Sequence, residues 1–197
     1  MTKTVDFYFD FGSPAAYLAW TQLPRLCAQT GAQLVLKPML LGGVFQATGN
    51  RAPISVPLKG RYLLADLTRF ARRYDVPLRM NPNFPINTLN LMRIAVGLQQ
   101  RQDLRFANYC AAMFRAIWVD AQNMNDPAVV AEVLAKSGFD AQEMLALSSD
   151  PAVKERLKAE TEAAVQRGIF GAPTFFVDDQ MFWGLDRLEF VREALAD

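Results

Sequence analysis

The alternation of apolar and polar side chains at the start of the chain predicts a strand that leads directly into a helix. Residues 5–10 (VDFYFD) have the period of two and the aromatic content of a strand. The pattern then breaks, and Ser13 suits a helix N-cap because its hydroxyl oxygen can accept from an amide in the first turn. Pro14 fits the first helical position, and the apolar spacing predicts a helix to about Thr30, with Gly31 as its stop signal.

A second strand is predicted over residues 33–39, immediately after this helix. A right-handed crossover would make the two strands parallel neighbours in one sheet. The turn at Ser13 would then lie at the carboxyl end of the first strand, the edge where open α/β sheets bind ligands. A group beside the Ser13 hydroxyl would also meet the positive end of the following helix, a setting that favours an anion or a thiolate.

The middle of the chain has helical periodicity and lacks strand patterns. A Gly-, Pro- and Asn-rich stretch over residues 40–57 predicts a long loop. Apolar spacings with Asp-Pro and Gly boundaries then predict a series of helices. These cover residues 58–74, 87–100, 103–119, 127–137, 140–147 and 151–167.

Strand patterns return only near the end of the chain. Residues 174–177 and 181–183 predict a hairpin around the turn at 178–179. A last helix is predicted over 186–196, where Asp186 and Glu189 have capping-box spacing. The order is β-α-β, helical insertion, β-β-α, which is an α/β fold. We expect residues 1–44 and 166–197 to form one domain and residues 45–165 to form a helical insertion domain.

Composition describes a globular protein with little net charge. The 197 residues are 51% hydrophobic, with 21 basic and 20 acidic side chains. Without a basic block, the chain lacks the features typical of proteins that bind nucleic acid or an anionic membrane surface, so neither is expected as a partner. No apolar run reaches the ~20 residues that cross a bilayer, and no signal peptide is recognised, so a cytoplasmic location is expected.

The absence of histidine excludes a Ser-His-Asp triad, a Cys-His pair and a metal site built on imidazole. If Ser13 takes part in chemistry, another molecule must therefore supply the reactive group. The alternative is that Ser13 caps its helix and does no more. Cys27 and Cys110 lie far apart in apolar stretches, so we expect two buried, reduced thiols, no disulfide framework and no metal site.

The element order, together with the segment GAPT at residues 171–174, resembles the thioredoxin-like fold in its DsbA-like form. That resemblance implies a cis-proline at Pro173. It also places the segment SPAA, residues 13–16, where redox members of the fold carry Cys-x-x-Cys. Because both cysteines are absent there, thiol-disulfide exchange at this turn is excluded.

Five segments resemble bacterial 2-hydroxychromene-2-carboxylate isomerases and kappa-class glutathione transferases across nearly the whole chain. They are DFGSPAAYLA, LGGVFQATGN, PLKGRYLLADL, NFPINTLNLMR and GIFGAPTFFVDDQMFWGLDRL. The resemblance implies a glutathione site in which Ser13 faces the sulfur and Asp186 holds the γ-glutamyl amino group. The other positions that it implies for glutathione binding are Asn50, Lys59, Ala172, Pro173 and Leu185.

Several of these residues have simpler interpretations. Asn50 could be a turn residue, Lys59 a solvated lysine at a helix start, and Asp186 a helix cap. Arg187 fits an orienting or surface role better than a ligand role. Leu185 departs from the kappa class, where a small polar side chain is frequent, although its backbone amide stays available.

The resemblance implies a glutathione-dependent cis-trans isomerase. Its substrate would be 2-hydroxychromene-2-carboxylate, a small aromatic carboxylate, interconverted with trans-o-hydroxybenzylidenepyruvate during the breakdown of naphthalene-like aromatics. It also implies a homodimer. One alternative is a kappa-class transferase that consumes glutathione. Another is a non-catalytic DsbA-like module that binds glutathione or a peptide.

Overall fold

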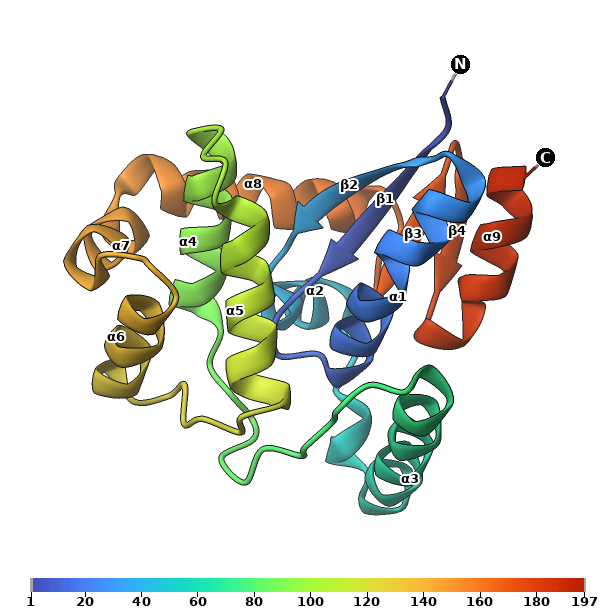
Figure 1. The fold of residues 1–197 in the computed structure, drawn as a ribbon, viewed down its shortest axis with the longest axis horizontal. Coiled ribbons are helices and arrows are strands. Elements are labelled where there is room, and N and C mark those ends of the chain that lie inside the picture. Colours follow the sequence, from blue (N-terminus) through green and yellow to red (C-terminus); the bar gives the residue numbers. More distant parts are fainter. Residues whose placement is uncertain (1, 197) are drawn as a thin grey trace.

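The computed structural model describes residues 2–196, and Figure 1 shows a central sheet surrounded by helices. The strands are β1 (Thr4–Phe9), β2 (Gln33–Pro38), β3 (Thr174–Val177) and β4 (Gln180–Trp183). The helices are α1 (Pro14–Thr30), α2 (Leu41–Thr48), α3 (Pro57–Tyr74), α4 (Leu89–Gln100), α5 (Phe106–Trp118), α6 (Pro127–Lys136), α7 (Ala141–Ser149), α8 (Pro151–Gln166) and α9 (Leu188–Ala196). Short 3-10 turns are η1 (Pro53–Ser55) and η2 (Leu185–Arg187).

The four-stranded sheet has the order β2-β1-β3-β4. β1 and β2 are parallel, as predicted, with Val5 opposite Leu34. β3 is antiparallel to both β1 and β4. This is the predicted β-α-β and β-β-α arrangement, with helices α2 to α8 between the two halves in the sequence. In Figure 1, α4 to α7 form a group beyond the β2 edge of the sheet and α9 lies near the opposite edge, beside β4.

The predicted loop over residues 40–57 is wrong in part, because it contains α2 and η1. Two glycines at the start of α2 obscure its helical pattern in the sequence. At Gly43 a Cβ atom would lie 3.1 Å from the Thr161 side chain of α8. The glycine therefore allows α2 to pack closely against α8, and this tertiary contact outweighs the low intrinsic helix propensity of glycine.

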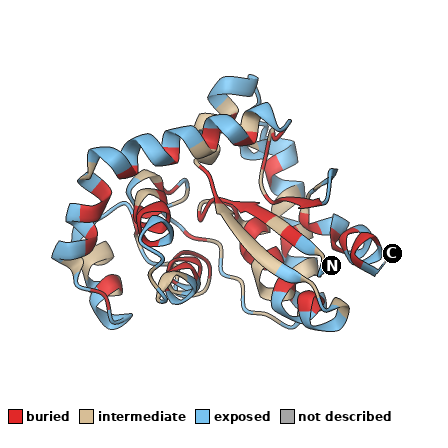
Figure 2. Cartoon of the chain, turned by 90° about the horizontal axis from the view of Figure 1, so that it is seen from above, coloured by how far each residue is buried: buried red, intermediate tan, exposed pale blue. Residues whose placement is uncertain are grey.

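The strand β1 is buried on both faces of the sheet, because its successive side chains point to opposite faces (Figure 2). Phe7 and Phe9 belong to the main core, whereas Tyr8 belongs to a smaller cluster with Met39 and Phe176 on the other face. A strand covered on both faces favours the aromatic and β-branched composition that β1 has.

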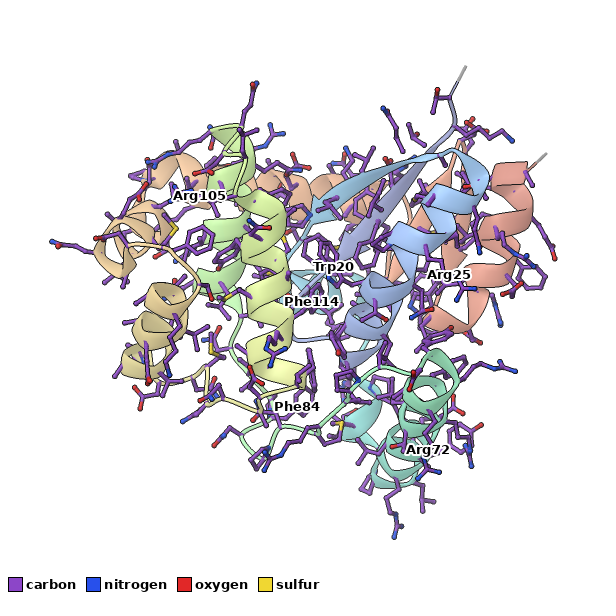
Figure 3. The ribbon with its side chains drawn as sticks, in the orientation of Figure 1. Trp20, Arg25, Arg72, Phe84, Arg105 and Phe114 are labelled. Atoms are coloured by element: carbon purple, nitrogen blue, oxygen red, sulfur yellow. The ribbon has the colours of Figure 1, made fainter. Side chains whose placement is uncertain are left out.

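Aromatic side chains connect the sheet with the helical segment. Phe114 of α5 packs against Phe11 with ring centroids 5.1 Å apart, and it faces Trp20 of α1 at 5.7 Å (Figure 3). The indole of Trp118 donates a hydrogen bond of 2.7 Å to the backbone oxygen of Phe11. The helices therefore share a core with the strands, while the domain limits at 1–44, 45–165 and 166–197 stay a prediction. Within residues 2–196, no helix combines the length and the apolar character needed to cross a membrane.

Candidate functional site

The Ser13 side chain lies at the junction of β1 and α1. It caps α1 as predicted, because its Oγ accepts from the Ala16 amide at 3.1 Å, and Pro14 follows at the first helical position. The same Oγ donates to the backbone oxygen of Ala172 at 3.2 Å. Ser13 is only 5% exposed. The hydroxyl therefore joins the start of α1 to a segment far away in the sequence, which capping alone does not require.

That distant segment contains the predicted cis-proline, since the bond between Ala172 and Pro173 is cis. The backbone oxygen of Pro173 accepts from the Gly184 amide at 3.0 Å. Two residues before the proline, a Cβ atom at Gly171 would lie 2.6 Å from Nε1 of Trp183. Gly171 thus allows the segment to pack directly against the end of β4.

A cavity of about 340 Å³ opens between the start of α1, the cis-proline segment, α2, α3 and η2. Of the predicted site residues, Ser13, Ala172, Pro173, Leu185 and Asp186 line it. Its wall is mainly apolar. The large apolar side chains are Leu41, Phe45, Ile54, Leu63, Leu64, Leu67, Phe70, Met80, Phe84 and Trp183.

Charges in the cavity are sparse. Asp66 and Asp186 line it, and its lining among the described residues includes no lysine or arginine. A negative sulfur beside Ser13 would therefore be stabilised by the Ser13 hydroxyl and the first amides of α1 rather than by a cationic side chain.

Asn50 and Lys59 are not among the residues that line this cavity. Asn50 is exposed, and its Nδ2 donates to the backbone oxygen of Phe170 at 2.8 Å. It therefore ties the loop after α2 to the segment that leads to the cis-proline. Lys59 is exposed in the first turn of α3. Their roles in ligand binding stay predictions.

Asp186 lies in η2, and its surroundings do not support the predicted capping box. The 3-10 turn begins after Gly184 without a side-chain cap, and α9 begins only at Leu188. The Asp186 carboxylate instead accepts from the Arg187 guanidinium at 2.9 Å. Gly184 has φ 108°, and a Cβ atom there would lie 2.5 Å from Oδ1 of Asp186. The glycine therefore leaves room for the carboxylate at the cavity, while Leu185 beside it is buried.

Asp10 is a buried residue that the sequence interpretation missed. It is 2% exposed, and its carboxylate accepts from the amides of Gly12 and Leu41, both at 2.8 Å, and from Thr88 Oγ1 at 2.7 Å. Burial raises the pKa of Asp10, and the hydrogen bonds from Thr88, Gly12 and Leu41 oppose that rise. Its position in the alternating strand pattern made it look like an ordinary polar strand residue.

The comparisons with known proteins agree with the fold. The model of the DsbA-like thioredoxin domain matches residues 4–196. The chain belongs to the DsbA-like thioredoxin family. Within residues 2–196 of this DsbA-like chain, no group of His, Cys, Asp or Glu side chains is placed to hold a metal ion.

Relatives match over the full length. A protein named 2-hydroxychromene-2-carboxylate isomerase from Sphingobium xenophagum is 36% identical over 202 residues, covering 100% of both chains. Glutathione S-transferase kappa 1 from Rattus norvegicus is 27% identical, covering 99% of this chain and 92% of the relative. A solved structure of a 2-hydroxychromene-2-carboxylate isomerase gives a TM-score of 0.85 at 32% identity, covering 98% of this chain and 94% of that chain. The predicted fold class and resemblance are confirmed.

The cysteines of this DsbA-like chain lie away from its Ser13 turn in the sequence. Cys27 and Cys110 are free and buried, as predicted. Burial raises the pKa of both thiols, that of Cys110 well above its ordinary value. Neither thiol has the features of a reactive cysteine.

Proposed function

We propose that the chain is a 2-hydroxychromene-2-carboxylate isomerase that uses glutathione as a thiol cofactor. One observation carries the proposal: a buried serine hydroxyl, rather than a cysteine, lies at the start of α1 and opens into an apolar cavity beside a cis-proline. A DsbA-like site without its own sulfur can perform thiol chemistry only with a sulfur from a small molecule. Full-length identity to proteins named as this isomerase supports the substrate assignment.

The residues present fit glutathione. The cavity of about 340 Å³ lies within the range of ~300 to 1,000 Å³ that small-molecule sites occupy. Asp186 supplies a carboxylate for an ammonium group, and Ala172 supplies a backbone oxygen next to the cis-proline. When bound, glutathione supplies a sulfur nucleophile that adds reversibly to a conjugated bond of the substrate.

Ser13 and the start of α1 would stabilise the thiolate form of the bound thiol. The helix end contributes about 0.3 to 1 kcal/mol, and a hydrogen bond to a charged group contributes about 1.5 to 3 kcal/mol. Because one pKa unit equals about 1.36 kcal/mol, the sum lowers a thiol pKa of ~8.5 by roughly one to three units. To donate to a sulfur, the Ser13 hydroxyl would turn away from its present acceptor, Ala172.

The apolar wall would hold the aromatic part of the substrate. Phe45 of α2, Phe70 of α3, Phe84 and Trp183 line it. Flat aromatic rings bind favourably against such faces and edges, and the apolar wall excludes water from the reacting bond. Asp186 would hold the γ-glutamyl end of glutathione at the η2 end of the cavity.

Thermal unfolding with and without glutathione tests the cofactor assignment. A ligand at ~100 times its Kd adds about 2.7 kcal/mol to the free energy of unfolding, which would raise the Tm. S-methylglutathione is the matched probe, because it retains the peptide but has no thiol to ionise. The proposal predicts a shift with both ligands and isomerase activity with glutathione alone. No shift at millimolar glutathione would contradict it.

The full-length match to kappa-class transferases supports a second candidate, a transferase that consumes glutathione. The two functions differ in the fate of the thiol. A homodimer and a cytoplasmic location are also part of our proposal, and sedimentation of the purified chain and fractionation of cells would test them.

A further inference from the structure

The Asp10 carboxylate connects two walls of the cavity that lie far apart in the sequence. Gly12, which belongs to the Ser13 turn, donates its amide to Oδ1, and Leu41, the first residue of α2, donates its amide to Oδ2. Both Gly12 and Leu41 line the cavity. The backbone oxygen of Asp10 also accepts from the Ser13 amide at 3.0 Å. Asp10 therefore contacts the Ser13 turn through its backbone and its side chain.

The start of α2 depends on groups outside the helix. Its N-cap residue, Leu40, has no side chain that can accept from the first amides. The Asp10 carboxylate takes this role for Leu41, and Thr161 Oγ1 accepts from the Leu40 amide at 3.0 Å. Since a negative group is favourable at a helix start, the carboxylate stabilises the start of α2 at this position.

Thr88 completes the surroundings of Asp10. It is the N-cap residue of α4, is buried, and donates its hydroxyl to Oδ1 at 2.7 Å. A Cβ atom at Gly12 would lie 3.3 Å from the same oxygen and 3.4 Å from the Thr88 side chain. The space around the carboxylate is thus closely packed, and β1, α2 and α4 converge on it.

We propose that Asp10 is a positioning residue that fixes the Ser13 turn against the α2 wall of the cavity, so that a thiol at Ser13 and a substrate on Phe45 meet in one geometry. The alignment of thiol and substrate rests on the proposed function. The link between the Ser13 turn and α2 rests only on the hydrogen bonds of Asp10.

An amide at position 10 cannot make the same bonds. The amides of Gly12 and Leu41 can only donate, so in Asp10→Asn one of them faces the NH₂ group of the asparagine. A displacement of about 1 Å in a reacting geometry costs up to ~100-fold in rate. We expect Asp10→Asn to lower kcat and to raise the Kd of glutathione, each by roughly 10- to 100-fold.

The experiment compares Asp10→Asn with Leu134→Ala, a buried control in α6 whose side chain does not line this cavity. Thr88→Val is a second variant, which keeps the carboxylate and removes one donor. We would measure Tm, glutathione Kd by calorimetry, kcat and KM, and the hydrogen exchange of the Gly12 and Leu41 amides in the ligand-free protein.

The proposal predicts that Asp10→Asn changes kcat, Kd and the exchange of both amides far more than Leu134→Ala does at an equal loss of Tm. Thr88→Val should change the same quantities in the same direction by a smaller factor, and it carries the test if Asp10→Asn does not fold. If kcat, Kd and amide exchange change in proportion to the loss of Tm in every variant, including Leu134→Ala, the proposal is overturned. If the wild type binds no glutathione, the proposed function fails, and unchanged exchange at Gly12 and Leu41 would still refute the positioning role.

Discussion

The Ser13 hydroxyl both caps α1 and reaches Ala172, so its removal separates a structural role from a chemical one. We expect Ser13→Ala to lower kcat by ~10- to 1,000-fold, the range for loss of one positioned donor to an anion. Loss of the cap alone costs about 0.5 to 2 kcal/mol of stability. Ser148→Ala is the control, because Ser148 is equally buried but donates to Leu145 in α7. Equal kinetics for both variants would reduce Ser13 to a cap.

The pH profile of Ser13→Ala identifies what the hydroxyl does. If it lowers the pKa of the bound thiol, the variant has too little thiolate at neutral pH, and its defect should shrink as the pH rises past the free thiol pKa of ~8.5. Steady-state kinetics from neutral to alkaline pH measure this. A defect of constant size would instead mean that Ser13 positions the substrate.

Asp186 is expected to bind ligand rather than stabilise its helix. Since its carboxylate makes no cap in η2, Asp186→Ala should weaken glutathione binding while leaving the Tm of the ligand-free protein almost unchanged. Asp126→Ala is a matched comparison, because Asp126 does cap α6 by accepting from Ala128 at 2.9 Å. That variant should lose ~1 kcal/mol of stability and keep its affinity. The reverse ranking would restore the capping interpretation of Asp186.

Local patterns predict some site residues and cannot predict others. Ser13 is predictable because the N-cap and the following proline are adjacent in the sequence. Asp10 is not, because its partners Leu41 and Thr88 lie 31 and 78 residues away. At Asp186 a local pattern predicts too much. The capping-box spacing predicts a helix cap, but the backbone forms η2 after Gly184 and the carboxylate caps no helix there.

At the level of elements, the predicted helices and strands are largely confirmed, with boundaries a few residues different. The exception is α2, whose glycines conceal a helix that forms only where Gly43 packs against Thr161 and Asp10 caps its first amide. Such an element depends on partners from other parts of the chain. Periodicity within the element does not contain that information.

The contact between α4 and α7 gives a prediction at this scale. A Cβ atom at Gly97 would lie 2.7 Å from Cγ of Leu147, so Gly97→Ala should force the helices apart and cost about 1 to 3 kcal/mol of stability. Gly42→Ala in α2 is the control, because nothing lies within 4 Å of its Cβ position. It should gain about 0.5 to 1 kcal/mol from helix propensity. Urea unfolding measures both, and equal effects would contradict the packing argument.

The connection between α4 and α5 gives a pH-dependent prediction. A side-chain hydrogen bond from Arg105 is the main cause that lowers the pKa of Asp103 from 3.8 to about 2. The ionised form is thus favoured by folding, and its stabilising effect is complete above pH 3.8 and lost as the pH falls towards about 2. Asp103→Asn should therefore be less stable than the wild type near neutral pH, and the difference should vanish in acid. A difference independent of pH would contradict this.

For the molecule as a whole, the order of elements predicts the fold. The resemblance points to residues of which Ser13, Ala172, Pro173, Leu185 and Asp186 line one cavity, and the assembly of that cavity comes from tertiary contacts. The hairpin around residues 178–179 and the β-α-β start are strong local patterns. Phe84 lines the cavity and packs against Trp118, whose indole donates to the backbone oxygen of Phe11, two residues before Ser13. The order of the elements along the chain does not show which helical faces meet at the cavity.

The fate of glutathione tests the central claim most directly. The measurement is conversion of 2-hydroxychromene-2-carboxylate by the wild type with glutathione far below the substrate concentration, while free thiol is titrated in parallel. If the cavity presents a recycled thiol, many equivalents of substrate should convert and the thiol should stay constant. Conversion that stops when the thiol is consumed would instead identify a transferase, and conversion without any thiol would refute glutathione as the cofactor.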